Sequence, residues 1–303
     1  MSSEPIGPHM AHAIPRLPDT QIAALSAAYR SAQAAKRRTT LIGVLALAIL
    51  IMVAGRVAEV DLVKLWNNAG QLTSYLGRIF YLDNGRLVFT DIADWYWGLG
   101  RWMSRLWDTL LIAYLGTLFG AIGAFFLCFA ATINLAVNPA QRFFARRFLE
   151  FCRTVPEIVF ALIFVVAFGL GPVPGVLAIM IHTVGALGKL FAEVVENIDM
   201  KPVEGAIASG ATRWQAIRYS VVPQVLPNFA SYALLRFEIN VRGASVMGFV
   251  GAGGIGQDLI EAIRKFYYSD VSAILLLIIA TVMIIDLVTE RIRHRLISLE
   301  HSR

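Results

Sequence analysis

From Ile158 to Gly188 the chain reads IVFALIFVVAFGLGPVPGVLAIMIHTVGALG, a stretch without Asp, Glu, Lys or Arg. One straight helix over this stretch would extend about 46 Å, well beyond the hydrocarbon core of a bilayer, which is about 30 Å thick. The segment GLGPVPG at residues 169–175 lies in its middle and is a strong helix breaker. We therefore predict two membrane-spanning helices joined by a turn on the outer side, with charged residues at both inner ends. Those charged residues are Glu150, Arg153, Glu157, Lys189, Glu193 and Glu196.

The composition of the whole chain is that of a membrane protein. Of its 303 residues, 57% are hydrophobic and 16% charged, and the mean hydropathy is +0.63. A soluble domain needs more polar surface than this. The net charge of +6 does not indicate a nucleic-acid partner, because the basic residues lie at the ends of apolar segments instead of forming one patch. The apolar runs predict six spans with both termini in the cytoplasm: 39–60, one within 109–140, the two arms of the hairpin, 223–250 and 271–288.

The loop between the fourth and fifth spans has a distinctive pattern. It reads EGAIASG from Glu204 to Gly210, and Pro223 follows thirteen residues after Gly210. This pattern predicts a short helix, a glycine turn, a second helix and a proline that opens the next span. Small residues at Ala206 and Ala208 leave a surface on which another protein can press closely. The plainer interpretation is an ordinary cytoplasmic loop helix.

This spacing resembles the coupling-loop signature of ABC-importer permeases. The chain departs from that signature at three positions, with Gly205 in place of the usual Ala, Ser220 in place of an aliphatic residue and Val222 in place of Leu. The resemblance implies an all-α membrane protein with the type I ABC importer permease fold. It also implies that a small set of loop residues docks in a groove of an ATPase subunit. These residues are Glu204, Ala206, Gly210 and Ala211.

Three further stretches narrow the resemblance. Residues 153–157, 182–193, and 237–242 followed by 248–256, are similar to phosphonate-importer permeases, and the likeness extends over about residues 100–295. It implies a permease subunit of an ATP-driven importer for phosphonates or related oxyanions such as phosphite and hypophosphite, in the bacterial inner membrane. The partners it implies are a second copy of the chain, two ATP-binding cassette subunits and an extracytoplasmic phosphonate-binding protein. Methionine-importer permeases resemble the last stretch as well.

On this basis we divide the chain into segments. Residues 1–38 are expected to form a cytoplasmic helical segment, 39–60 the first span, and 61–106 an outer-face interfacial segment rich in Trp and Tyr. Residues 107–295 are expected to form the permease domain, with its coupling loop at 196–222, and 296–303 a cytoplasmic tail. The N-terminus does not resemble a cleavable signal peptide, because the first apolar run begins only at Leu41.

Charged residues inside the fifth span are candidates for a transport pathway or gate. Glu238 and Arg242 are four residues apart and can pair on one helix face, whereas Arg236 points elsewhere. Arg236 or Arg242 could offer a fork of donors to an oxyanion. Alternatively, both could clamp helices together, with Arg236 paired to a neighbour such as Glu193. His182 is either a hydrogen-bonded packing residue or a pore-lining one.

The run Gly251-x-Gly253-x-x-Gly256 has the letters of a dinucleotide fingerprint, but no strand precedes it and the topology puts it on the outer face. We interpret it as a flexible turn. The sharper hypothesis is that its exposed N–H groups gate the pathway or receive an anion. The sequence has no Gly-x-x-x-x-Gly-Lys-Ser/Thr phosphate loop, so ATP and magnesium are expected on a partner subunit and no cofactor on this chain.

Two other classes of function compete with the permease. A secondary transporter would show internal repeats or carboxylates that bind ions at mid-membrane, and no clear repeat is visible. A membrane enzyme would need catalytic groups at suitable spacing, and the five histidines are scattered. We therefore expect no catalytic residue and no metal site.

Overall fold

The computed structural model describes residues 18–82 and 84–301 of the chain. The predictions for residues 1–17 and 302–303 lie outside this part. The described residues are almost entirely helical, and their only β pairing is an isolated bridge between Tyr81 and Leu87. The chain divides into two compact units at residues 72 and 73.

The first unit contains one long helix and the start of another. Helix α1, Asp19–Val57, runs without interruption through residue 38, where the sequence analysis placed a boundary. Its apolar window is not buried at any position in the described structure, as expected of a helix that faces lipid on all sides. Helix α2, Leu62–Ile79, crosses the division between the units.

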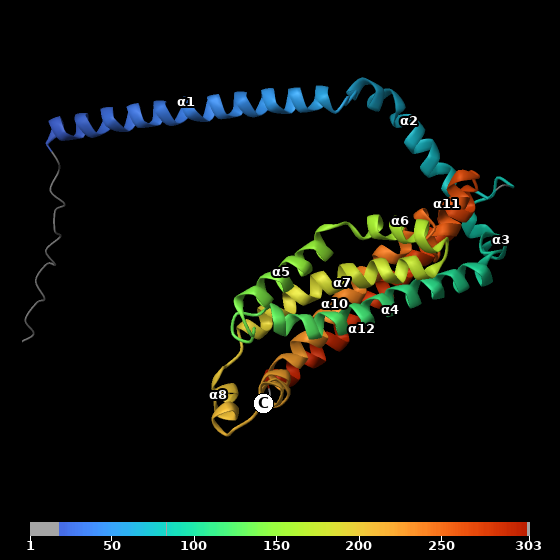
Figure 1. Cartoon of the computed structure of the whole chain (residues 1–303). Coiled ribbons are helices and arrows are strands. Elements are labelled where there is room, and N and C mark those ends of the chain that lie inside the picture. The colour runs from blue at the N-terminus through green and yellow to red at the C-terminus, as the bar shows by residue number, and fades with distance from the viewer. Residues whose placement is uncertain (1–17, 83, 302–303) are drawn as a thin grey trace, which may run out of the picture. The chain divides into compact units, whose positions relative to one another are not determined.

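The second unit is a bundle of long helices with short elements between them. Figure 1 shows α4, α7, α10 and α12 running side by side. Its elements, in chain order, are η1 Val88–Thr90, α3 Ile92–Trp95, α4 Leu99–Ala131, α5 Pro139–Thr154, α6 Glu157–Phe168, α7 Pro172–Glu196, α8 Lys201–Ala208, α9 Arg213–Ala216, η2 Ile217–Val221, α10 Val222–Met247, η3 Gly248–Val250, α11 Gly256–Arg264 and α12 Tyr268–His301.

Small residues allow α4 and α7 to approach closely. A Cβ atom added at Gly116 would lie 2.6 Å from Ile179 Cγ2, and one added at Gly120 would lie 2.6 Å from Thr183 Cβ. Two glycines four residues apart form a flat strip on one helix face, the usual device for close packing of helices in lipid. The contact fixes α7 in the centre of the bundle.

The predicted hairpin is present, and its turn lies at Gly169–Gly171. Both glycines have positive φ, 86° and 145°, which other residues adopt only at a cost. The first arm of the hairpin is helix α6, which by itself is shorter than the full membrane span predicted for it. Helix α6 has 12 residues, about 18 Å, and it continues α5 across a bend of 85°. Pro156 lies at this bend. It interrupts the helix because it lacks an N–H group and disfavours helical geometry in the residue before it.

Within the described residues, four helices are long and apolar enough to cross a membrane by length and composition: Thr20–Val57, Leu99–Ala131, Pro172–Glu196 and Tyr268–Arg295. The bent pair α5 and α6 makes a fifth if it is one span. The predicted fifth span corresponds to α10, which is 26 residues long but is not in this group. It carries three charged residues in its second half: Arg236, Glu238 and Arg242.

The glycine run after α10 forms a turn, as predicted, but the turn is packed against other segments and is not open to solvent. Residues 252–256 are buried, so their N–H groups are not exposed for an anion. The Gly171 N–H donates to the carbonyl of Gly251 (3.0 Å), and the Ile255 N–H donates to Thr109 Oγ1 (2.8 Å). The run therefore ties α4 to the hairpin turn between α6 and α7.

Candidate functional site

The loop helix α8 ends in a well-formed glycine cap. Gly210 follows the helix with φ of 88°. Its N–H donates to the carbonyl of Ile207 (2.9 Å), and the Ala211 N–H donates to the carbonyl of Ala206 (3.1 Å). This pair of bonds is the Schellman motif, which requires a left-handed residue after the helix. Three of the four predicted docking residues thus have a definite structural role, which is to end α8 sharply.

Outside its cap, α8 presents an exposed surface. Val203 is 1% exposed and anchors the helix to the bundle core, whereas Ile207 is 56% exposed. Trp214 is 71% and Tyr219 70% exposed on the segment that follows. Glu204, in the first turn of α8, is also exposed. Large apolar side chains exposed on this loop are candidates for contact with another protein.

The segment after α8 leads without a break into α10. Helix α9 begins with a capping box in which the Gln215 side chain accepts from the Thr212 N–H (2.8 Å). The π-helical turn η2 then joins α9 to α10. Pro223 occupies the first turn of α10, so it opens the long helix as predicted but does not separate it from the preceding one. Helices α9 and α10 therefore form one continuous helical segment through η2.

A first charged cluster joins three helices where the hairpin arm bends. Glu157 of α6 lies 3.8 Å from His182 Nδ1 of α7 and 4.0 Å from Arg236 Nη2 of α10, and Arg236 and His182 are themselves in hydrogen-bond contact. The Arg236 side chain is 13% exposed. The proposed partner Glu193 is wrong, because its carboxylate pairs with Lys189 (3.5 Å).

A second cluster joins α10 to α12. The predicted pair of Glu238 and Arg242 is confirmed, with Arg242 Nη2 donating to Glu238 Oε1 at 2.6 Å. The same nitrogen also donates to Asp286 Oδ2 at 2.7 Å. Two carboxylates therefore share one guanidinium. Asp286 belongs to another helix and follows no spacing rule, so the sequence did not indicate it.

A third polar contact was not found from sequence. Asn240 of α10 is fully buried, and its amide nitrogen donates to Thr117 Oγ1 of α4 (2.8 Å) and to Thr183 Oγ1 of α7 (2.9 Å). Hydrogen bonds of this kind hold membrane helices together. The three uncharged residues give no signal in a hydropathy pattern.

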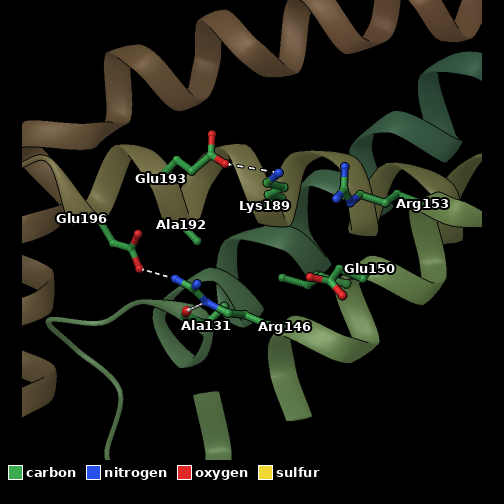
Figure 2. A pocket seen from close by; sticks show the side chains of 9 residues that line it. Ala131, Arg146, Glu150, Arg153, Lys189, Ala192, Glu193 and Glu196 are labelled. Atoms are coloured by element: carbon green, nitrogen blue, oxygen red, sulfur yellow. Dashed lines mark hydrogen bonds and ion pairs between the residues drawn. The ribbon is translucent and has the colours of Figure 1, made fainter. Parts of the chain in front are cut away.

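A small cavity lies between α5 and α7 at the end of α4 (Figure 2). Its volume is about 120 Å³. Two ion pairs border it: Arg146 with Glu196 (2.5 Å) and Lys189 with Glu193 (3.5 Å). The lining residues are Ala131, Arg146, Leu149, Glu150, Arg153, Lys189, Ala192, Glu193 and Glu196.

A protein-family comparison covers most of this bundle. The family described as binding-protein-dependent transport system inner membrane component matches residues 116–298. The chain belongs to this family. The permease is thus a multi-pass component of a transport system in the inner membrane, and it has the type I importer fold that the coupling-loop pattern predicted.

Individual relatives extend the comparison. The permease is 44% identical over 189 residues to the phosphite transport system permease protein of Stutzerimonas stutzeri, covering 62% of this chain and 69% of that protein. A relative in Escherichia coli (strain K12), named for a cryptic phosphonate transport system permease, is 51% identical over 121 residues, 40% of this chain and 99% of that one. An inward-facing structure of a methionine ABC transporter matches with a TM-score of 0.57 at 20% identity, covering 66% of this chain and 96% of that one.

Removing the shared guanidinium should destabilise the permease. We expect Arg242→Leu to cost about 1–3 kcal/mol, because Glu238 and Asp286 each lose a charge-assisted hydrogen bond to the guanidinium. The measurement is the temperature at which the purified protein aggregates in detergent. Arg264→Leu, at an exposed arginine of α11, is the control and should leave that temperature unchanged. Equal stability of Arg242→Leu and the wild type would show that this cluster does not hold α10 to α12.

Proposed function

We propose that this permease is the membrane subunit of an ATP-driven importer for phosphonates or related phosphorus oxyanions such as phosphite. The observation that carries the proposal is the 44% identity to a phosphite transport system permease. The identity to a relative named for phosphonate transport supports the same class of cargo. The methionine transporter shares the fold at 20% identity, which says nothing about cargo.

The proposed complex contains two copies of the permease, two ATPase subunits that bind ATP and magnesium, and an extracytoplasmic binding protein. Six spans per copy, with both termini in the cytoplasm, agree with the charge distribution. The capped helix α8 is the proposed contact with the ATPase, through Glu204 and the exposed apolar surface around Ile207. ATP binding closes the ATPase pair, α8 moves with it, and the continuous α9–η2–α10 segment carries the movement into the membrane.

Two hypotheses concern the charged residues of α10: contact with the transported oxyanion, or a structural clamp between helices. Arg236 is mostly buried and contacts both Glu157 and His182, and Arg242 is engaged by two carboxylates. These contacts favour the clamp for both arginines and a packing role for His182. Contact of Arg236 or Arg242 with the oxyanion stays a hypothesis, since it requires a state in which these pairs open.

The proposal is tested with the permease reconstituted in lipid together with its cognate ATPase and binding protein. Methylphosphonate, 2-aminoethylphosphonate, phosphite, phosphate and methionine are supplied in turn, and uptake and ATP hydrolysis are measured. We expect a phosphonate or phosphite to stimulate both. Stimulation by methionine alone would overturn the proposed class of cargo. Failure of the permease to assemble with any ATPase would favour the alternative function of a secondary transporter.

A further inference from the structure

The charged side chains that line the cavity between α5 and α7 do not all pair with one another. Three carboxylates border it, and each is already engaged. Glu196 accepts from Arg146 and from the Ile133 N–H (2.8 Å), and Glu193 pairs with Lys189. The third, Glu150, is held at 2.6 Å by Arg147, which does not line the cavity. Three cations line the cavity as well. Because Arg147, which is not among them, pairs with Glu150, one of the three lining cations has no carboxylate partner among the lining residues.

That cation is Arg153. Among residues 18–82 and 84–301, no carboxylate lies within ion-pair distance of its guanidinium. Figure 2 shows it on the same side of the cavity as Lys189. Its backbone is held firmly against α7, because a Cβ atom at Gly185 would lie only 2.6 Å from the Arg153 N. A guanidinium on a fixed backbone, with its donors unused, is well suited to bind an anion.

The second available cation is Lys189. Its ammonium is 3.5 Å from Glu193 Oε1, longer than the 2.7–2.9 Å typical of a strong charge-assisted bond. It can therefore turn toward a ligand at small cost. The cavity of about 120 Å³ has room for several water molecules, and Ala131, Leu149 and Ala192 line it together with the charged residues.

From this geometry we propose that the cavity is a second binding site, on the inner side of the membrane, for a tetrahedral phosphorus oxyanion held by Arg153 and Lys189. The inner side follows from the arginines of α5 and the loop before it. The cargo class rests on the proposed function. An oxyanion that accumulates in the cytoplasm bridges α5 to α7 at this site and slows the next transport cycle. The phosphate of an inner-leaflet lipid has the same chemistry.

Direct binding tests the site without transport. The purified permease–ATPase complex, without the binding protein, is dialysed in neutral detergent against labelled methylphosphonate. We expect Arg153→Gln and Lys189→Gln each to weaken binding by about tenfold or more, and Arg153→Lys to restore part of it. Arg142→Gln is the matched control, because Arg142 is a partly exposed arginine of α5 that does not line the cavity. Unchanged binding by Arg153→Gln, in a complex that still hydrolyses ATP, would overturn the proposal.

A second experiment separates the two sources of the oxyanion. The complex is placed in nanodiscs of phosphatidylcholine or of phosphatidylglycerol, and the same binding is measured. Binding in phosphatidylcholine identifies free oxyanion as the ligand. Binding that phosphatidylglycerol abolishes, with lipid adducts in native mass spectra that Arg153→Gln removes, identifies the lipid phosphate. Absence of both overturns the site. Failure of uptake with every phosphorus compound would instead overturn the proposed function and leave these binding results standing.

Discussion

Valine in place of Gly185 is expected to prevent the permease from accumulating as a folded protein. A Cβ atom at this position would lie 2.6 Å from the Arg153 N, 2.7 Å from the Leu149 carbonyl oxygen and 2.8 Å from Cys152 Cβ. Two of these three atoms are backbone, so no side chain can rotate away to make room. The helices α5 and α7 would have to separate, and we expect a cost above about 3 kcal/mol, at the upper end for overpacking a core.

The measurement is the amount of monodisperse protein after extraction in detergent, together with its aggregation temperature. Gly185→Ala should be folded but clearly less stable, since even one carbon atom meets the α5 backbone. Gly100→Ala is the control within the same unit, because an added Cβ there has no neighbour within 4 Å and alanine favours the helix. Normal yield and stability of Gly185→Val would show that α5 does not lie against α7 at this point.

The elements that the sequence predicted well are those with a local cause. Glycine and proline at residues 169–175 marked the hairpin turn, and the glycine after α8 marked its end, because only a few residue types tolerate those backbone angles. The pair of Glu238 and Arg242 followed from helical spacing alone. Each of these features depends on residues close together in the chain.

The elements that the sequence could not predict depend on contacts between distant segments. The position of Pro156 was visible, but whether a proline ends, bends or merely begins a helix depends on what packs beside it. Glu193 was offered as one example of a partner for Arg236, whereas the arrangement of α6, α7 and α10 brings Glu157 to it instead. The burial of the glycine run around Gly253 follows from its contact with the hairpin turn, which no pattern within the run reveals.

Valine in place of Gly210 is expected to uncouple the permease from the proposed ATPase subunit while leaving the bundle intact. Gly210 has φ of 88°, a region that costs most residues about 1–2 kcal/mol and β-branched residues more. The two bonds that end α8 both depend on this conformation. Helix α8 has eight residues and cannot keep its shape without its cap. Substrate uptake and ATP hydrolysis stimulated by the binding protein should therefore fall at least tenfold.

Two comparisons distinguish this effect from general unfolding. Gly210 is exposed and an added Cβ has no neighbour within 4 Å, so the aggregation temperature of Gly210→Val should stay near that of the wild type. Gly205→Ala is the matched control on the same helix: its Cβ also meets open space, and alanine stabilises a helix by about 1 kcal/mol over glycine. It should couple as well as the wild type. If Gly210→Val transports normally, the shape of α8 is not what links the ATPase to the membrane helices, and the link must lie in another inner segment.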